Sequence, residues 1–72
     1  MKPNGHAIKA IRERSGLDVA QLAEMTGCSR RFIAYIEAND RAGSPKVIKA
    51  IAAALKVPVT AIISDVPIED AA

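Results

Sequence analysis

Two adjacent arginines, Arg30 and Arg31, are the residues whose types and spacing point most directly to chemistry. They open a predicted helix, and at about 100° per residue Ala34, Tyr35 and Ala38 fall on the same arc. Two guanidinium groups, a phenol and two small side chains suit a helix that lies against a polyanion with its backbone close to it. Because the helix macrodipole disfavours cations at an N-terminus, a purely structural surface would more often place acids there. The arc therefore indicates anion binding.

The opposite arc of this helix faces the core and carries a single acid, Glu37. In the helix predicted over residues 6–14, Arg12 lies on the same apolar side as Ile8 and Ile11, by the i, i+3, i+4 rule. Either charge alone in a small core would carry a large desolvation cost, so we expect the two to pair in a largely buried salt bridge. The alternative is that both side chains are partly exposed and never meet.

The segment before the arginines predicts a short turn between two helices. Asp18 is an N-cap candidate with Gln21 three residues later, which is the capping-box spacing. Gly27 tolerates the positive φ that ends the helix begun at Asp18, and Ser29 is a good N-cap for the next helix. Two helices joined by so short a turn cross at a steep angle, so the second can stand out from the body.

Two further helices complete the predicted fold. Ser44 and Pro45 provide an N-cap and a first helical residue for a helix over residues 45–56. Pro58 begins a last short helix that ends at residue 63 or 64. The chain is therefore expected to be all-α, with five helices.

The expected domain spans residues 6–64, after a flexible N-terminal arm at residues 1–5 and before an acidic tail at residues 65–72. Apolar residues in and just before the tail exceed what so small a core can easily cover. These residues are the candidates for a dimer interface, to which the tail can contribute. They are Val59, Ile62, Ile63, Val66 and Ile68.

Length and composition restrict the classes of function. A chain of 72 residues forms one domain and is too short for a doubly wound enzyme fold. No paired acid and base, nucleophile set or metal cluster converges, so we expect no enzymatic activity. One cysteine and one histidine exclude a disulfide framework and leave too few ligands for a structural zinc site, so neither a metal nor a cofactor is expected.

The location is expected to be cytoplasmic, because no apolar run approaches a membrane span and the N-terminus lacks the pattern of a signal peptide. Charge is distributed unevenly along the chain. Residues 1–64 contain ten basic groups against five acids, a net charge of +5, whereas residues 65–72 carry three acids. The folded part is therefore basic and the tail is not.

The chain resembles the Cro and lambda-type repressor helix-turn-helix proteins, also called the XRE class, over residues 8–63. Any one of the matching residues would be a weak signal, but together they are specific. They are Leu22, Ala23, Gly27, Cys28, Ser29, Ile33, Ile36, Glu37, Pro45, Ile51, Ala52, Ala54, Leu55, Lys56 and Val57. The resemblance implies a compact five-helix lambda-repressor-like DNA-binding domain. The second and third helices would form the helix-turn-helix, with the third in the DNA major groove.

The function that this resemblance implies is a sequence-specific, double-stranded DNA-binding transcriptional regulator, a Cro-like repressor of the small phage or prophage type. The positions that match the family's base readers are Arg30, Arg31, Ala34 and Tyr35. Each arginine can bond guanine O6 and N7 in bidentate fashion, worth about 1–3 kcal/mol of discrimination. Ala34 and Tyr35 can pack on thymine methyl groups or reach sugar and phosphate. The salt bridge predicted above also matches a buried ion pair that joins the first and third helices of family members.

Phosphate contacts are expected around the same helix. Val19 stands where the family usually has a glutamine, so only its backbone N–H, at the positive end of its helix, can serve there. Asp40 is an acid in a loop that the family usually turns toward the phosphates. The residues expected to contact phosphate are Val19, Gln21, Ser29, Phe32, Asn39, Arg41 and Lys46.

Two copies of the chain are expected to act together, at least on DNA, with their recognition helices about 34 Å apart on a pseudo-palindromic operator. The alternative function is a protein-interaction module, such as an antitoxin or antirepressor component, whose exposed helix docks on a partner protein. The two differ in salt dependence, because counterion release makes DNA binding weaken steeply as salt rises.

Overall fold

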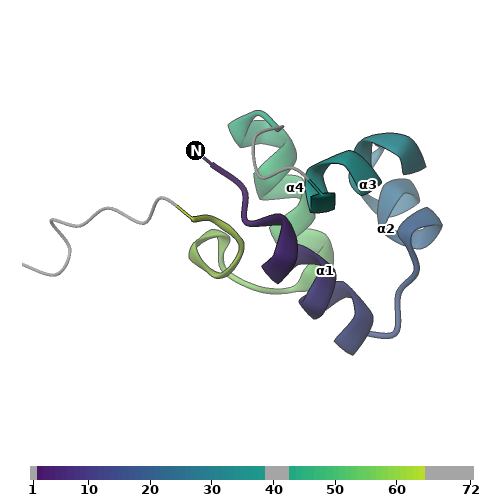
Figure 1. Cartoon of the computed structure of the whole chain (residues 1–72), viewed down its shortest axis with the longest axis horizontal. Coiled ribbons are helices and arrows are strands. Elements are labelled where there is room, and N and C mark those ends of the chain that lie inside the picture. Colours follow the sequence, from purple (N-terminus) through teal and green to yellow (C-terminus); the bar gives the residue numbers. More distant parts are fainter. Residues whose placement is uncertain (1, 39–42, 65–72) are drawn as a thin grey trace, which may run out of the picture.

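The computed structural model describes residues 2–38 and 43–64, which form four α-helices and one short 3-10 helix (Figure 1). In chain order these elements are α1 (Gly5–Arg14), α2 (Val19–Thr26), α3 (Arg30–Ala38), α4 (Pro45–Leu55) and the 3-10 helix η1 (Val59–Ile62). The helix-turn-helix is formed by α2 and α3, as predicted. The expected count of five helices is not confirmed as five α-helices: the described residues form four, and the last short helix that was expected after Pro58 is the 3-10 helix η1.

The reason that η1 is short lies at its two ends. Pro58 precedes it in an extended conformation, and Ile63 follows it in an extended conformation with φ −119° and ψ 153°. Ile63 forms an antiparallel bridge with Pro3, so the chain must leave the helix there. Four residues between these points leave no room for a regular α-helix, in which each bond spans four residues.

At the start of each α-helix, a side-chain oxygen of the preceding residue accepts a hydrogen bond from a backbone N–H three residues later. The Asp18 carboxylate accepts from Gln21 N–H at 2.7 Å and the Gln21 amide oxygen accepts from Asp18 N–H at 2.8 Å, so the capping box is confirmed. Ser29 Oγ accepts from Phe32 N–H at 3.0 Å, and Ser44 Oγ accepts from Val47 N–H at 3.3 Å. The cap of α1 was not predicted: Asn4 Oδ1 accepts the Ala7 N–H at 3.1 Å.

Three helices end in the same left-handed turn. Gly16 follows the Ser15 cap of α1 with φ 77°, and Gly27 ends α2 with φ 74°, the latter as predicted from the sequence. Lys56 ends α4 with φ 59°, although it carries a side chain and was expected to be the last residue of the helix. At this end Lys56 N–H donates to Ala52 O and Ala53 O, and Val57 N–H also donates to Ala52 O at 3.0 Å, so these last carbonyls of the helix are paired.

The core lies between the packed helices: α3 contacts α1 and α2, α2 also contacts α4, and η1 contacts α1 and α4. Its buried apolar side chains are Ile8, Leu22, Ala23, Ile33, Ile36, Ile48, Ile51, Ala52, Leu55 and Ile62. Ile62 is fully buried in this core, so its assignment to a dimer interface is wrong. Because η1 packs against both α1 and α4, the side chain of its one buried residue, Ile62, lies in the core.

The N-terminal segment does not have the structure expected of a loose arm. Asn4 N–H donates to Ile62 O at 2.8 Å and Ser64 N–H donates to Lys2 O at 2.8 Å, on either side of the buried Pro3. Residues 2–4 are therefore paired with residues 62–64. In Figure 1 these paired segments lie at the end of the molecule opposite the start of α3.

Gly5, the first residue of α1, packs directly against the end of α3. A Cβ at this position would lie 2.3 Å from Ile36 O and 2.5 Å from Glu37 O. Both neighbours are backbone atoms, so neither can move by a side-chain rotation. We expect Gly5→Ala to destabilise the protein by about 1–3 kcal/mol, the usual cost of overpacking, despite the better helix propensity of alanine. Chemical denaturation measures the change.

The control for Gly5→Ala is His6→Ala, the next residue in the same helical turn. His6 is exposed, so its truncation is expected to change the free energy of unfolding by less than about 0.5 kcal/mol. A Gly5→Ala protein as stable as the wild type would mean that α1 and α3 separate at little cost.

The described helices include none that is both long and apolar enough to cross a membrane.

Candidate nucleic-acid interface

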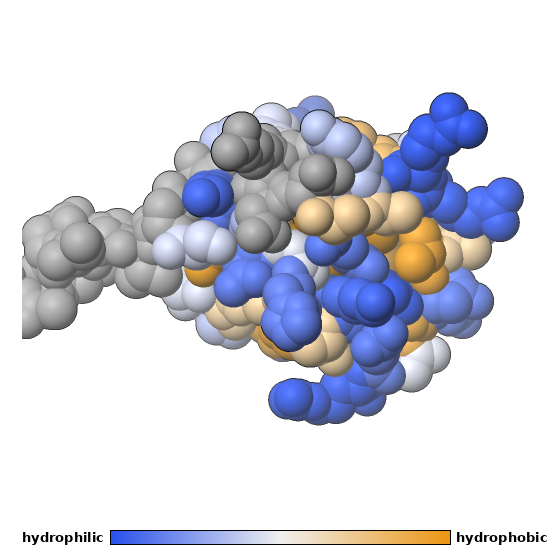
Figure 2. Space-filling model, viewed as in Figure 1, coloured by the Kyte–Doolittle hydropathy of each residue, from blue (hydrophilic) through white to orange (hydrophobic). Residues whose placement is uncertain are grey.

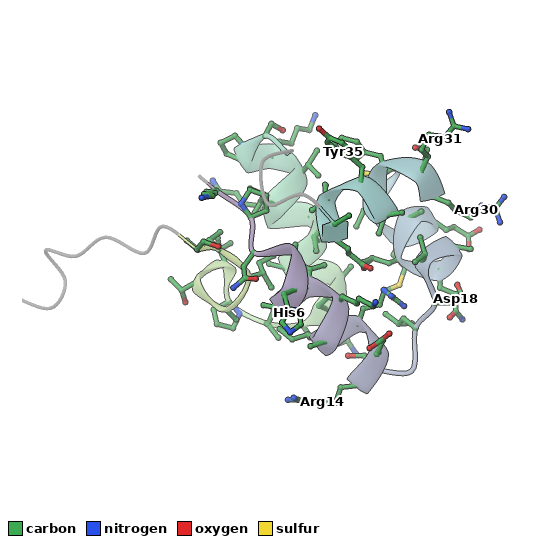
Figure 3. The ribbon with its side chains drawn as sticks, in the orientation of Figure 1. His6, Arg14, Asp18, Arg30, Arg31 and Tyr35 are labelled. Atoms are coloured by element: carbon green, nitrogen blue, oxygen red, sulfur yellow. The ribbon has the colours of Figure 1, made fainter. Side chains whose placement is uncertain are left out.

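Arg30 and Arg31 open α3 at one end of the molecule. Both side chains are exposed and point away from the body of the protein (Figure 3). Within residues 2–38 and 43–64, neither guanidinium has a hydrogen-bond or ion-pair partner. Figure 2 shows hydrophilic side chains projecting at this end of the molecule, next to apolar surface. Two cations are thus presented to solvent on a helix that the core holds from the other side.

The remaining predicted base readers lie on the same exposed face of α3. Ala34 is exposed and Tyr35 is 51% exposed, whereas Ile33 and Ile36 are completely buried on the opposite face. The separation of the helix into two arcs, expected from the sequence, is therefore confirmed. The structure brings all four predicted base readers to one surface.

Two shallow, open hollows lie next to each other along the exposed face of α3 and share two lining residues, Val19 and Ala34. The first hollow continues to Ser29, Arg30 and Arg31. The second continues past Val19 and Ala34 and is lined further by Lys9, Arg12, Glu37 and Ala38. We call these two hollows together the α3 trough; it has an apolar middle and positive charge at both ends.

The salt bridge between Arg12 and Glu37 lies under the second hollow and confirms the prediction. Arg12 Nε donates to Glu37 Oε2 at 2.7 Å and Nη2 donates to Oε1 at 3.1 Å, while Nη1 donates to Leu17 O at 2.8 Å. The two side chains are only 8% and 7% exposed. The hydrogen bond to Glu37 raises the pKa of the Arg12 guanidinium against the opposing effect of burial, so Arg12 is charged. The pair joins α1 to α3.

The predicted phosphate contacts fall into different places. Val19 is the half-buried first residue of α2 and lies in the α3 trough with Ser29. Ser29 also lines another hollow, outside the α3 trough, together with Arg31, Phe32 and Tyr35. Phe32 is half-buried. These residues are therefore close to the predicted base readers.

Gln21 lies in a different hollow, which it lines together with Asp18, Glu24 and Arg30. Its amide oxygen already accepts from Asp18 N–H. Arg30 therefore links this hollow to the predicted base readers, while the two acids beside Gln21 oppose a phosphate there. Lys46 is exposed on the second residue of α4. Asn39 and Arg41 lie outside the described residues.

Lys9 is a trough residue that was absent from the predicted site. It is exposed on α1 and lines the second hollow with Ala34 and Ala38 of α3. The signal was present in the sequence, because Lys9 stands three residues before Arg12 and so shares its side of α1. Its position adds a third cation to the surface that Arg30 and Arg31 begin.

No group of three or more histidine, cysteine, aspartate or glutamate side chains is arranged to hold a metal ion in the part of the chain that the structure describes.

Comparison with known families identifies this arrangement. The family model described as helix-turn-helix matches residues 8–62, from the first buried isoleucine of α1 to the last residue of η1. The chain belongs to the XRE-type helix-turn-helix family. The match covers α2, α3 and the turn between them, so the family's namesake unit is the one that carries Arg30 and Arg31.

Two curated proteins of this family are similar to the chain. The immunity repressor protein of Bacillus phage phi105 is 39% identical over 61 residues, which cover 85% of this chain and 42% of the repressor. The HTH-type transcriptional repressor RghR of Bacillus subtilis is 43% identical over 60 residues, which cover 81% of this chain and 44% of RghR. The chain thus spans less than half the length of these relatives.

Among solved structures, the N-terminal DNA-binding domain of SinR from Bacillus subtilis has the same fold. The two structures superpose with a TM-score of 0.71 at 30% sequence identity, and the match covers 78% of this chain and 83% of the SinR chain. SinR, a master regulator for biofilm formation, has also been solved in complex with DNA.

Proposed function

We propose that this chain is a sequence-specific, double-stranded DNA-binding domain of a transcriptional repressor, with α3 in the major groove. The observation that carries the proposal is the exposed face of α3, where Arg30 and Arg31 extend into solvent beside Ala34 and Tyr35. The names of the phage repressor and of RghR, and the DNA complex of SinR, support it.

The proposed mechanism divides the surface into base readers and phosphate contacts. The forked guanidinium groups of Arg30 and Arg31 would each match the two major-groove acceptors of a guanine. The N–H groups at the start of α2, beginning with Val19, would face a phosphate together with the Ser29 hydroxyl, whose oxygen already accepts from the backbone. Lys9 and Lys46 would neutralise further phosphates. Phosphate contacts set the register and base contacts set the sequence.

Two copies of the chain would bind a pseudo-palindromic operator, with their α3 helices about one turn of DNA, 34 Å, apart. Val59 and Ile63 are half-buried at η1 and remain candidates for the contact between copies. Val66 and Ile68 lie outside the described residues. Dimer formation on DNA and a cytoplasmic location stay predictions.

Binding to duplex DNA at increasing salt concentration tests the proposed function. Each phosphate that the protein neutralises is expected to lower the slope of log K against log salt by about 0.9, so several contacts give a steep loss of affinity. Selection of bound duplexes from a random pool would reveal the preferred sequence. A protein-interaction module of the antitoxin or antirepressor kind would instead show no salt-dependent binding to duplex DNA and no enriched sequence.

A further inference from the structure

The middle of the α3 trough offers an incoming base no hydrogen-bonding side chain. Val19 and Ala34 line both hollows and so form the surface that joins them. Val19 contributes two methyl groups from the first turn of α2, and Ala34 contributes one from the middle of α3. A helix that lies in the major groove with this face toward DNA brings these methyl groups to the edges of the bases.

The charged pair beneath the trough, Arg12 and Glu37, is nearly buried and bonded within the protein. Three nitrogens of Arg12 already donate to Glu37 and to Leu17 O, and both oxygens of Glu37 accept from Arg12. The exposed groups able to form new hydrogen bonds stand at the ends of the trough, at Ser29, Arg30 and Arg31 on one side and at Lys9 on the other. The trough is therefore apolar between cationic ends.

Base chemistry restricts what can fill such a space. In the major groove, guanine and adenine present hydrogen-bonding groups, and cytosine presents an amino group beside a small C5–H. Burying the polar groups against methyl groups would leave them without partners. Thymine alone among the four bases presents a methyl group there, at C5. A cytosine that carries a C5 methyl presents the same group.

We propose that Val19 and Ala34 form a cradle for the C5 methyl group of a pyrimidine, so that the chain reads a thymine through Val19. This proposal rests on the proposed DNA-binding function and adds a specificity-determining residue to it. Val19 would thus do more than offer its backbone N–H to a phosphate. The valine that replaces the family's usual glutamine becomes a reader of methylation state at one base position.

Changes of a single methyl group in the DNA test the cradle without altering the protein. In the duplex enriched by selection, each thymine is replaced in turn by deoxyuridine, which removes only the methyl group. At one thymine per half-site we expect binding to weaken about fourfold, since burying one such carbon contributes about 0.8 kcal/mol. At the same position, a 5-methylcytosine·guanine pair should bind about fourfold tighter than an unmethylated one.

Protein variants then locate the methyl-sensing surface. Val19→Gln is expected to bind the duplex with no penalty for deoxyuridine at that position, because a polar amide replaces the apolar wall. Val47→Gln is the matched control: Val47 is also half-buried near the start of a helix, yet it lies outside the trough, so its methyl sensitivity should equal that of the wild type. Ala34→Ser, at an exposed position, provides a second variant if Val19→Gln does not fold.

Three results would overturn the cradle. If the duplex is bound but no single deoxyuridine changes the affinity by more than about twofold, no methyl group is read, although the DNA-binding function stands. If Val19→Gln and Ala34→Ser fold and keep full methyl sensitivity, the methyl group is read elsewhere on the protein. If no duplex is enriched and binding shows no salt dependence, the proposed function and the cradle fail together.

Discussion

Replacing Glu37 by alanine is expected to destabilise the protein by about 3–5 kcal/mol, because it leaves the Arg12 guanidinium buried without its partner. Arg12 is held between α1 and α3 with a side chain 8% exposed, so water cannot easily replace the missing carboxylate. For a domain of this size each kcal/mol shifts the melting temperature by roughly 4–8 °C, so the loss amounts to tens of degrees. Thermal melting followed by circular dichroism measures it.

Two further variants separate the buried charge from the general loss of an acid. Glu24→Ala removes an exposed carboxylate from α2 and is expected to leave the melting temperature within a few degrees of the wild type. The double variant Arg12→Met with Glu37→Leu replaces both charges by apolar side chains and should recover most of the stability. A Glu37→Ala protein that melts like Glu24→Ala would show that the bridge contributes little to the fold.

The parts of the fold that the sequence predicts correctly are those with local chemical causes. Asp18 and Gln21 cap α2 because an acceptor and an amide stand three residues apart, and Gly27 ends it because glycine tolerates positive φ at little cost. The partnership of Arg12 and Glu37 spans 25 residues, yet it was predictable, since two opposite charges on apolar faces have few other solutions in a small core.

The features that the sequence does not reveal depend on contacts between distant segments. Residues 2–4 have the composition of a polar terminus, but they pair with residues 62–64. No local sequence pattern in either segment predicts this pairing. Ile62 and Ile63 are the same residue type, and only the geometry of η1 determines that Ile62 is the one that is fully buried. Lys56 takes a left-handed conformation without a glycine because the bond from Val57 N–H to Ala52 O closes the helix there.

The candidate site shows the same division. The exposed arc with Arg30 and Ala34 follows from helical periodicity alone, because the buried isoleucines of α3 fix which side faces out. The trough does not follow from any one helix: Lys9 comes from α1, Val19 from α2 and Ala34 from α3. Its apolar middle becomes apparent only when the three helices are packed together.

Replacing Arg30 and Arg31 together by alanine is expected to weaken binding to the selected duplex by about 2–6 kcal/mol, because each bidentate contact to a guanine is worth roughly 1–3 kcal/mol. The fold should be unaffected, since both side chains are exposed and have no partner among the described residues. The single variants should each relax preference at one base pair, as measured by repeating the selection with the variant protein. The losses of binding free energy of the two single variants need not add up to the loss of the double variant, because the effects of adjacent residues are coupled.

The control for this loss of affinity is Arg14→Ala, which removes the same charge from a different surface. Arg14 is exposed at the end of α1 and points away from Arg30 and Arg31 (Figure 3). If the two arginines of α3 contact only phosphates, their removal would lower affinity equally for all sequences and reduce the salt slope by about 0.9 for each phosphate that is no longer neutralised. If they read bases, the affinity would fall steeply for the selected duplex and little for an unrelated one. An equal decrease for both duplexes would therefore remove these residues from the base readers while leaving them in the phosphate contacts.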